Sequence, residues 1–434
     1  VYALANHLSF AMTPDQFKAV RDILADMGSD KIMYRLIQGD VGCGKTLVAS
    51  LALYACVLSG HQGAIMAPTE ILARQHAVSL KKLFVGLPIK IDVLCSSLPS
   101  AKKKEVLQAM KDGTLNLVAG THALFQKEVE FAKLGLVVAD EQHRFGVEQR
   151  RALKEKGEKV DFLLMSATPI PRTLAATLYG DMDISTIMTM PPGRKPIQTQ
   201  LVEENSLRTI MPQLLDQLEQ GGQIYIVCSA IEENENFDGR NVLDIFESLS
   251  EAFSGKAKLG LMHGRMSSEE KERAMHDFEA NTTQILVSTT VIEVGVNVVN
   301  ACCMVIYDAH RFGLSQLHQL RGRVGRGRRQ GYCFLLTASK DPESLARLKI
   351  MEQTTDGFEI AMKDLEQRGP GELLGTRQSG VPGLILGDLV ADTKIIQTAR
   401  QDAVRILNDP DNAEFQPLLT KIRKENESAI SYMD

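Results

Sequence analysis

Two short segments of this sequence carry the residue types that bind and hydrolyse a nucleotide. Residues 39–46 read GDVGCGKT, which matches the pattern GxxxxGK[ST], and residues 140–143 read DEQH. The first segment follows the apolar run 33–37 and opens into a helix-like stretch, 46–58, so it has the strand, loop and helix context of a phosphate-binding loop. We therefore predict one nucleotide site that uses both segments.

Each residue type in this site has a chemical role. Glycine lets the backbone turn its N–H groups toward phosphate oxygens, and the start of the following helix adds a positive dipole end. The glycines concerned are Gly39, Gly42 and Gly44. Lys45 is expected to reach the β- and γ-phosphates, and Thr46 and Asp140 to hold Mg²⁺. Glu141 is the candidate base for the attacking water, so the expected cofactors are ATP and Mg²⁺.

Length and composition limit the class of protein. A chain of 434 residues with 44% hydrophobic residues is long enough for about three packed domains. It contains no apolar run of about 18 residues, and its start has neither an initiator Met nor the shape of a secretion signal. We expect a cytoplasmic protein without a membrane segment, and a fragment of a larger chain.

Charge and cysteine content narrow the class further. The net charge of −5 argues against a protein that coats nucleic acid, so any DNA contact must be local. The strongest candidate for such a DNA contact is the arginine-rich run LRGRVGRGRR at 320–329. For the smaller basic cluster, Lys102 to Lys104, an exposed and solvated surface is favoured over DNA contact. The seven cysteines show no CxxC spacing and are expected to be reduced structural thiols. For Cys43, inside the phosphate loop, a space-filling role is favoured over a reactive thiol.

Apolar strand-like runs alternate with helical patterns through two successive blocks, which is typical of parallel sheets covered by helices. The first block has its runs at 34–38, 64–67, 89–94, 115–119, 136–139 and 162–166. The second has them at 223–228, 258–262, 284–288, 303–307 and 332–336. The predicted fold class is α/β, with two parallel-sheet lobes in tandem.

The run PPGRKP indicates where the lobes join, because three prolines and a glycine in six residues exclude regular structure. The predicted domains are lobe 1 at 1–190, a linker at 191–196, lobe 2 at 197–340 and a C-terminal segment at 341–434. The last of these combines helical periodicity with a glycine-rich run at 367–380.

The second block has no phosphate loop of its own but carries QLRGRVGR at 319–326. Arg323 and Arg326 are three residues apart, so on a helix they would project from one face and enter the gap between the lobes. A guanidinium that meets the γ-phosphate there would act as an arginine finger, an effect of about 10³–10⁵ in rate. Hydrolysis would then depend on closure of the lobes.

These segments together resemble the superfamily 2 helicases, which have two RecA-like lobes. The matches in the first lobe are FAMTPDQ (10–16), APTEILARQH (67–76), GTHALF (120–125) and SATPIPRT (166–173). Those in the second lobe are IYIVCS (224–229), MHGRM (262–266), STTVIEVGVNV (288–298) and QLRGRVGR. Within the superfamily, DEQHRFG with KDLEQRGPGELLGTRQSG (363–380) resembles the RecG branch-migration helicases and, less closely, the transcription-repair coupling factor.

The resemblance implies roles for individual residues. Phe10 and Gln16 would contact adenine, and Asn297, which stands where the family usually has an acid, would lie near the ribose and alter nucleotide affinity. Residues that would couple hydrolysis to movement are His143, Ser166, Thr168 and Gln319. Those along a DNA backbone would be Pro68, Thr69, Gly120, Thr121, Thr289 and Thr290, and those in a C-terminal helical hairpin and loop that drives translocation would be Arg368 and Gln378. For the Thr and Ser residues, helix caps and turn hydroxyls remain an alternative, as a structural role does for His143.

The main hypothesis is an ATP-dependent DNA helicase that translocates on duplex DNA and remodels branched DNA by fork regression and Holliday-junction branch migration. The implied partners are branched or duplex DNA, with single-strand-binding protein or other replication-fork proteins, and a wedge domain expected in cis is missing from this chain. Two alternatives stay open: the motor of a transcription-repair coupling factor, and a nucleotide-gated clamp that holds DNA without movement. A metabolic kinase would not explain arginines spaced for an inter-lobe site.

Overall fold

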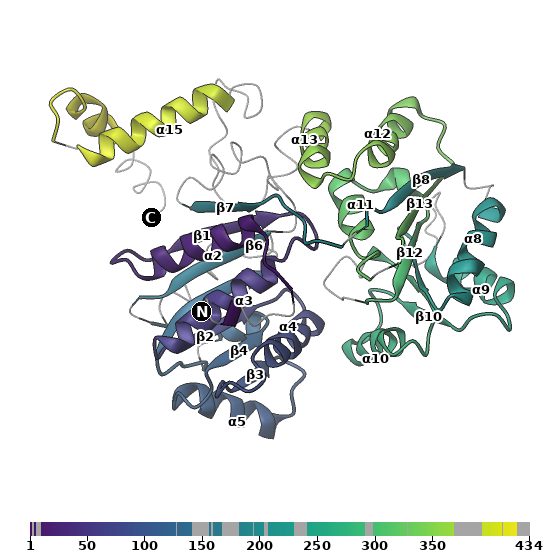
Figure 1. Cartoon of the computed structure of the whole chain (residues 1–434), viewed down its shortest axis with the longest axis horizontal. Helices are drawn as coiled ribbons and strands as arrows, with labels where there is room; N and C mark the ends of the chain where they lie inside the picture. The colour runs from purple at the N-terminus through teal and green to yellow at the C-terminus, as the bar shows by residue number, and fades with distance from the viewer. Residues whose placement is uncertain are drawn as a thin grey trace, which may run out of the picture.

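The structure is a computed structural model, and its described strands form two parallel sheets that lie side by side (Figure 1). This confirms the predicted α/β class with two lobes. The described residues are 1, 4–5, 10–126, 128–140, 156–157, 159–166, 182–193, 195–203, 207–229, 241–290, 298–327, 329–368, 393–409 and 411–422.

Lobe 1 is built on a sheet of strands in the order β3-β4-β2-β5-β6-β1-β7, and each described pair is parallel. The strands are β1 (Tyr34–Gly39), β2 (Gln62–Met66), β3 (Ile91–Leu94), β4 (Leu117–Gly120), β5 (Leu134–Asp140), β6 (Asp161–Ser166) and β7 (Asp183–Ile187). Because parallel strands end at one edge of a sheet, the segments after β1, β6, β5, β2 and β4 lie along that edge in this order. The edge is where the predicted site residues fall.

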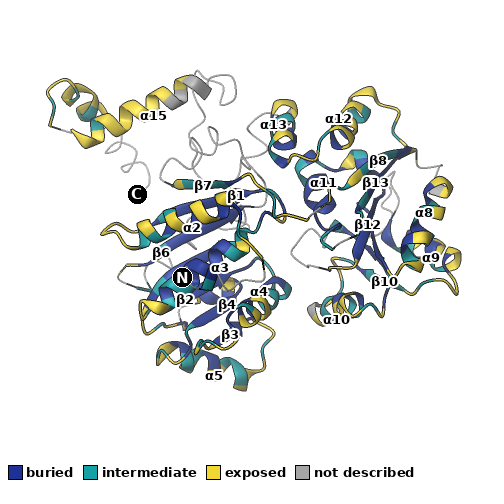
Figure 2. Cartoon of the chain, in the orientation of Figure 1, coloured by how far each residue is buried: buried dark blue, intermediate teal, exposed yellow. Residues whose placement is uncertain are grey.

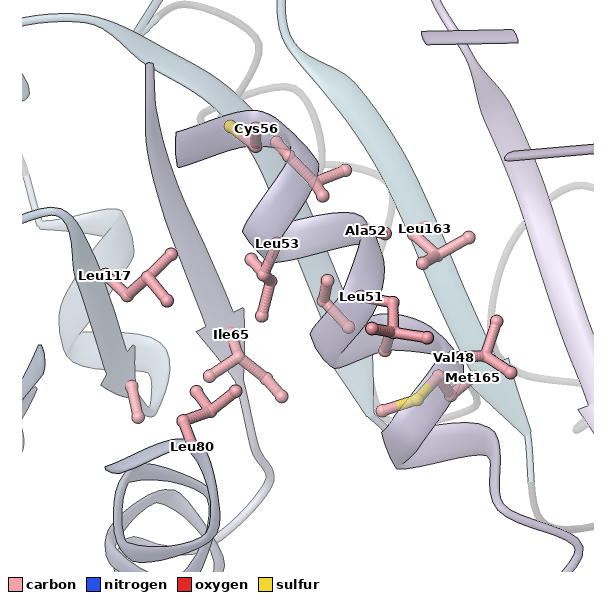
Figure 3. Close-up of a cluster of buried hydrophobic side chains, with 14 of the residues drawn as sticks. Val48, Leu51, Ala52, Leu53, Cys56, Ile65, Leu80, Leu117, Leu163 and Met165 are labelled. Atoms are coloured by element: carbon pink, nitrogen blue, oxygen red, sulfur yellow. The ribbon is translucent and has the colours of Figure 1, made fainter. Parts of the chain in front are cut away.

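Among the described residues, the helices that cover this sheet are α2 (Pro14–Met27), α3 (Lys45–Leu58), α4 (Glu70–Leu83) and α5 (Ser100–Lys111), with a short 3-10 turn, η1 (His122–Phe125). Helix α3 is apolar on most of its faces, and Val48, Leu51 and Leu53 are fully buried. Figure 3 shows these side chains against Ile65, Leu163 and other apolar groups of the sheet. The helix after the phosphate loop is therefore a core element, which gives the loop a rigid base.

Lobe 2 repeats the arrangement with strands in the order β10-β11-β9-β12-β13-β8, again all parallel. Its strands are β8 (Gln198–Glu203), β9 (Gln223–Val227), β10 (Leu259–Met262), β11 (Ile285–Ser288), β12 (Ala301–Ile306) and β13 (Tyr332–Thr337). Its helices are α8 (Leu207–Glu219), α9 (Val242–Ala252), α10 (Ser268–Glu279), η5 (Ala309–Arg311) and α11 (Leu314–Arg321). The chain passes from one sheet to the other through residues 188–197.

The C-terminal part adds α12 (Pro342–Gln353), α13 (Gly357–Arg368) and α15 (Thr393–Asn408). Helices α12 and α13 pack against lobe 2, where Leu348, Met351 and Ile360 join its buried core. Figure 2 shows the contrast between the buried sheets and α15, whose described residues are mostly exposed.

The predicted strands agree with the structure to within a few residues at each end, but two strands were not predicted. β7 is the last strand of the first sheet and β8 the last of the second. Both strands mix polar with apolar residues and are only partly buried, so neither contains the continuous apolar run on which the prediction relied.

Candidate nucleotide site and DNA interface

The phosphate loop connects β1 to α3, as predicted. Gly42 and Gly44 have φ angles of 84° and 91°, in the left-handed region that only glycine adopts easily. The Lys45 ammonium donates to the main-chain oxygens of Gly39 at 2.7 Å and Asp40 at 2.9 Å. In this structure the lysine is therefore held by carbonyls of its own loop. Thr46 is exposed at the start of α3.

Cys43 is fully buried within this loop, and burial raises the pKa of its thiol. A Cβ on Gly39 would lie 2.6 Å from the Cys43 sulfur and 2.6 Å from the main-chain oxygen of Ile187. The thiol therefore fills space between the loop and β7, in agreement with the predicted role.

The acidic residue predicted to hold the metal lies on the same edge of the sheet. Asp140 ends β5 and Ser166 ends β6, the strand between β5 and β1. The nearby His76, buried in α4, is 2.9 Å from the Asp140 carboxylate through Nε2. Carboxylate and hydroxyl oxygens are the donors that Mg²⁺ prefers, so Asp140 and Thr46 fit that ion by their chemistry.

The segment predicted to contact adenine meets the phosphate loop from another side. Thr13 and Gln16 form a capping box at the start of α2: the Gln16 amide oxygen accepts from Thr13 N at 2.9 Å, and Gln16 N lies 3.3 Å from the Thr13 hydroxyl. The Gln16 amide nitrogen donates to the Cys43 main-chain oxygen at 2.7 Å. Gln16 is buried, whereas Phe10 is 52% exposed. In this conformation the amide nitrogen of Gln16 supports the phosphate loop, while its amide oxygen closes the capping box of α2.

The arginine-rich run of lobe 2 reaches the phosphate loop, but not as a helix. Helix α11 ends at Arg321, with Gly322 as its C-cap, so the prediction that Arg323 and Arg326 project from one helical face was wrong. Gly325 has a φ of 68°, which a helix cannot accommodate. A Cβ on Gly322 would lie 2.7 Å from the Val41 Cβ, so the turn after α11 packs directly on the loop.

The arginines of this run have different surroundings. Arg323 is 8% exposed, and Arg326 donates through Nε to the Gly322 main-chain oxygen at 3.2 Å. Arg321 is 2% exposed and donates to main-chain oxygens of Met351 and Thr354. The prediction that the whole run offers DNA a basic surface was therefore wrong for Arg321, which is a buried structural residue.

A cavity of about 350 Å³ lies beside the contact between the loop and lobe 2. Its volume is in the usual range for small-molecule sites. The lobe 1 residues that line it include Asp40, Val41 and Met190, the connector supplies Lys195, and the lobe 2 side includes His318. The space beside the phosphate loop is thus shared by both lobes.

The residues predicted along a DNA backbone follow strand ends as well. Pro68 and Thr69 come after β2, and Gly120 and Thr121 end or follow β4, its neighbour in the sheet. Thr69 is the N-cap of α4, and Pro68, Thr69 and Thr290 are partly exposed. Thr121 and Thr289 are buried in this conformation. The neighbouring strands β2 and β4 therefore bring four of the predicted residues, Pro68, Thr69, Gly120 and Thr121, to one part of the sheet edge in lobe 1.

Several predicted residues lie outside the described part of the chain: Glu141, His143, Thr168, Asn297 and Gln378. Arg368 ends α13, and its side chain is outside the description too, whereas Gln319 is buried in α11. Sequence reasoning missed Asp40, His76 and His318, which make contacts at the site. His76 is the last residue of the segment APTEILARQH, and His318 directly precedes QLRGRVGR. Their position in or beside a family motif was the only signal in the sequence that could have pointed to them.

No helix in the described part of the chain is long and apolar enough to span a membrane.

Comparison with known families gives matches along most of the chain. Residues 13–177 match the DEAD/DEAH box helicase model, and residues 206–328 match the helicase conserved C-terminal domain. Residues 354–429 match the model described as ATP-dependent DNA helicase RecG, domain 3, C-terminal.

Curated relatives carry the same description. The chain is 53% identical over 400 residues to the ATP-dependent DNA helicase RecG of Bacillus subtilis (strain 168), an alignment that covers 92% of this chain and 59% of the relative. It is 52% identical over 403 residues to the RecG of Streptococcus pneumoniae serotype 4, with 93% of this chain and 60% of the relative covered. The chain thus spans about 60% of the length of these relatives.

The fold agrees with a solved structure of RecG bound to a three-way DNA junction. The TM-score is 0.74 at 43% sequence identity, and the match covers 91% of this chain and 52% of that one. Sequence and fold lead to one conclusion: the chain belongs to the RecG family of ATP-dependent DNA helicases.

Proposed function

We propose that this chain is the motor of an ATP-dependent translocase on duplex DNA that remodels branched DNA, by fork regression and Holliday-junction branch migration. The observation that carries the proposal is the packing of the turn after α11 on the phosphate loop of the other lobe, Gly322 against Val41. A site shared by two lobes makes hydrolysis depend on their relative position. That dependence is what converts ATP turnover into movement.

In this proposal Lys45 leaves the carbonyls of its loop and neutralises the phosphates, while Thr46 and Asp140 hold Mg²⁺. The metal, when bound, neutralises charge on the β- and γ-phosphates. Glu141 orients the attacking water, and Arg323 and Arg326 complete the site from lobe 2. Arg323 directly follows the residue that touches the loop, which supports its assignment as the finger.

The proposed substrate is branched duplex DNA. The related RecG was solved on a three-way DNA junction, and the strand-end hydroxyls and amides near Thr69 and Thr290 suit phosphates rather than bases. A motor that holds DNA in this way can travel over any sequence. It would work on the bacterial chromosome in the cytoplasm, with single-strand-binding protein or other fork proteins as further partners.

The test is strand displacement from a synthetic Holliday junction with ATP and Mg²⁺. We expect ATP-dependent unwinding by the parent chain and none by Lys45→Ala, which removes the phosphate-neutralising charge. Displacement of a triplex strand along duplex DNA, measured in parallel, reports translocation alone. DNA-stimulated hydrolysis without either displacement would favour the clamp and contradict the proposal. Removal of a stalled RNA polymerase without junction unwinding would favour the coupling factor.

The proposed role of Arg323 as an arginine finger can be tested separately. Arg323→Ala should bind ATP with nearly parental affinity but lose most DNA-stimulated turnover, by about 10³-fold or more if the guanidinium meets the γ-phosphate. Arg329→Ala is the matched control, because Arg329 lies in the same run and donates to the Gln220 main-chain oxygen instead. Steady-state hydrolysis with saturating duplex DNA measures the effect. Equal turnover in Arg323→Ala and the parent would remove the assignment.

A further inference from the structure

The carboxylate of Asp40, the second residue of the phosphate loop, is directed at the other lobe. Its Oδ1 accepts from His318 Nε2 at 2.5 Å and from the backbone N–H of Val41 at 2.5 Å. Its Oδ2 accepts from the backbone N–H of Gly357 at 3.3 Å. His318 belongs to α11, and Gly357 is the first residue of α13. One side chain therefore joins the phosphate loop to two separate helices.

The contacts of Asp40 continue into a closed ring of hydrogen bonds. His318 Nδ1 lies 2.9 Å from the Arg321 guanidinium, which can only donate, so the Nε2 of His318 carries the proton that goes to Asp40. Arg321 in turn donates to the main-chain oxygen of Thr354 at 3.0 Å. Thr354 is three residues before Gly357, whose N–H returns to Asp40. The phosphate loop thus closes a ring with α11 and with the turn between α12 and α13.

Helix α13 is also bonded to α11 away from Gly357. The Asp364 carboxylate on α13 accepts from the Ser315 N–H at 3.2 Å and from the Ser315 hydroxyl at 2.6 Å. Ile360 and Leu365 are buried beneath the helix. A displacement at Gly357 must therefore move α13 together with α11. The far end of α13 is Arg368, which leads into the glycine-rich run 369–380 that the family resemblance connects with translocation.

The packing around Gly357 leaves no room for adjustment. An added Cβ would lie 2.6 Å from His318 Nε2 and 2.9 Å from the Asp40 Cγ. The carboxylate also sits at the N-terminus of α13, where a helix favours negative charge. Burial would raise the pKa of Asp40, but the hydrogen bonds from His318 and the Val41 amide, together with the Lys45 charge, lower it below its ordinary value. Asp40 is thus a partly buried, ionised carboxylate, so the loss of one of its hydrogen-bond partners should be costly.

We infer that Asp40 is a positioning residue that links the nucleotide state of the phosphate loop to the position of helix α13. Lys45 donates to the main-chain oxygen of this same residue, and a bound phosphate takes that ammonium away. Residue 40 then loses a restraint on its backbone, and its carboxylate shifts relative to His318 and Gly357. The inference deepens the proposed function, on which its mechanical part rests, and adds a direct path from the phosphates to the translocation segment.

The first test follows the helix and does not need translocation. Hydrogen exchange of the amides at 357–360 is measured by mass spectrometry with and without a saturating non-hydrolysable ATP analogue and Mg²⁺. In the parent we expect the analogue to change this exchange severalfold. In Asp40→Ala, with occupancy confirmed by titration, the same amides should exchange at one rate in both conditions. Glu366→Gln is the control on α13, because Glu366 is an exposed residue near the far end of that helix.

The second test leaves every residue of the nucleotide site unaltered. Gly357→Ala inserts a methyl group between His318 and Asp40, whereas Gly28→Ala, the control, adds one where the nearest atom is 3.3 Å away. We expect Gly357→Ala to keep ATP hydrolysis but to consume about tenfold more ATP per triplex strand displaced. Gly28→Ala should match the parent in both measurements.

The outcomes separate this inference from the proposed function. A nucleotide response at 357–360 that persists in Asp40→Ala, or a parent without any response, overturns the role of Asp40. An unchanged ATP cost per strand in Gly357→Ala does so as well. A parent that shows the exchange response but displaces no strand refutes the proposed translocase and leaves the Asp40 link intact.

Discussion

At the scale of single residues, two histidines hold the acids of the nucleotide site. His318 contacts Asp40 of the phosphate loop, and His76 contacts Asp140 at the end of β5. Each comes from a helix outside the loop that it supports. His76 lies on α4, whose N-cap is Thr69, one of the residues predicted along the DNA backbone. The proposed metal site and the proposed DNA contact thus share a helix.

His76→Ala should weaken metal binding without unfolding the lobe. Groups that orient a metal ligand contribute about 10–100-fold to affinity, so we expect at least a tenfold higher Mg²⁺ requirement for hydrolysis. Mn²⁺ binding measured by electron paramagnetic resonance provides a second readout that does not depend on turnover. His276→Ala, at an exposed position in α10, is the control. An unchanged Mn²⁺ affinity would mean that Asp140 keeps its position without His76.

Asp15 gives a prediction about pH. The backbone N–H and the hydroxyl of Thr189, then the N–H of Met188, donate to its carboxylate and lower its pKa. A carboxyl with a lowered folded pKa contributes stability that is present above its unfolded pKa, about 3.9, and is lost as the pH falls through the folded value. Asp15→Asn should therefore lower the unfolding free energy at pH 7, and the difference should shrink below about pH 4. Urea unfolding across this range measures it; a difference that grows on acidification would contradict the assignment.

At the scale of elements, the start of α2 acts both as a helix end and as a support for the phosphate loop. Its capping box uses Thr13 and Gln16, and Gln16 continues to the Cys43 carbonyl. Helix α10 begins with a capping box of the same type, Ser267 with Glu270, on the other lobe. The molecule therefore contains a matched pair of helix ends, of which one contacts the phosphate loop.

Thr13→Ala and Ser267→Ala should each reduce the unfolding free energy by about 1 kcal/mol, because each removes an N-cap side chain. Only Thr13→Ala should also weaken ATP binding, since Gln16 then loses the geometry that places it against Cys43. Denaturant unfolding and titration with a fluorescent nucleotide measure the two effects. Equal nucleotide affinity in the two variants would show that the capping box has no role in the site.

Much of the fold could be predicted from the sequence, because central parallel strands are buried on both faces and their sequences are therefore continuous apolar runs. β7 and β8 lie at sheet edges, and their residues alternate in burial, so DISTI and QTQLVE give no such run. The phosphate loop and Asp140 were found because local pattern determines them. His76, Asp40 and His318 were missed because their partners are 64 and 278 residues away, and no local pattern encodes that distance.

At the scale of the whole molecule, the lobes also meet away from the phosphate loop. The Arg74 guanidinium on α4 lies 3.1 Å from the Glu272 carboxylate on α10, and Ile71 packs against the core of lobe 2. Both charged side chains are more than a third exposed, at 38% and 35%. A pair so accessible to water is screened by salt, and exposed pairs contribute about 0.2–1 kcal/mol.

Glu272→Gln should therefore change DNA-stimulated hydrolysis by less than about threefold at low salt, and the difference should disappear near 0.5 M salt. Removal of the buried partners of Asp40 should have a larger effect that salt does not abolish, since buried pairs are screened much less. Hydrolysis rates of Glu272→Gln and His318→Ala at two salt concentrations make the comparison. A larger, salt-resistant effect in Glu272→Gln would place the dominant inter-lobe contact at α4 and α10.

The ring through Asp40 has a consequence for thermodynamics. Free energies of binding at two linked sites are reciprocal, so the factor by which ATP alters affinity for a ligand of α13 equals the factor by which that ligand alters affinity for ATP. Duplex DNA that engages the segment after Arg368 would consequently alter the affinity of the site for ATP through the two hydrogen bonds that join Asp40 to α11 and α13. The bound DNA would then help to determine the affinity of the enzyme for ATP in the next cycle.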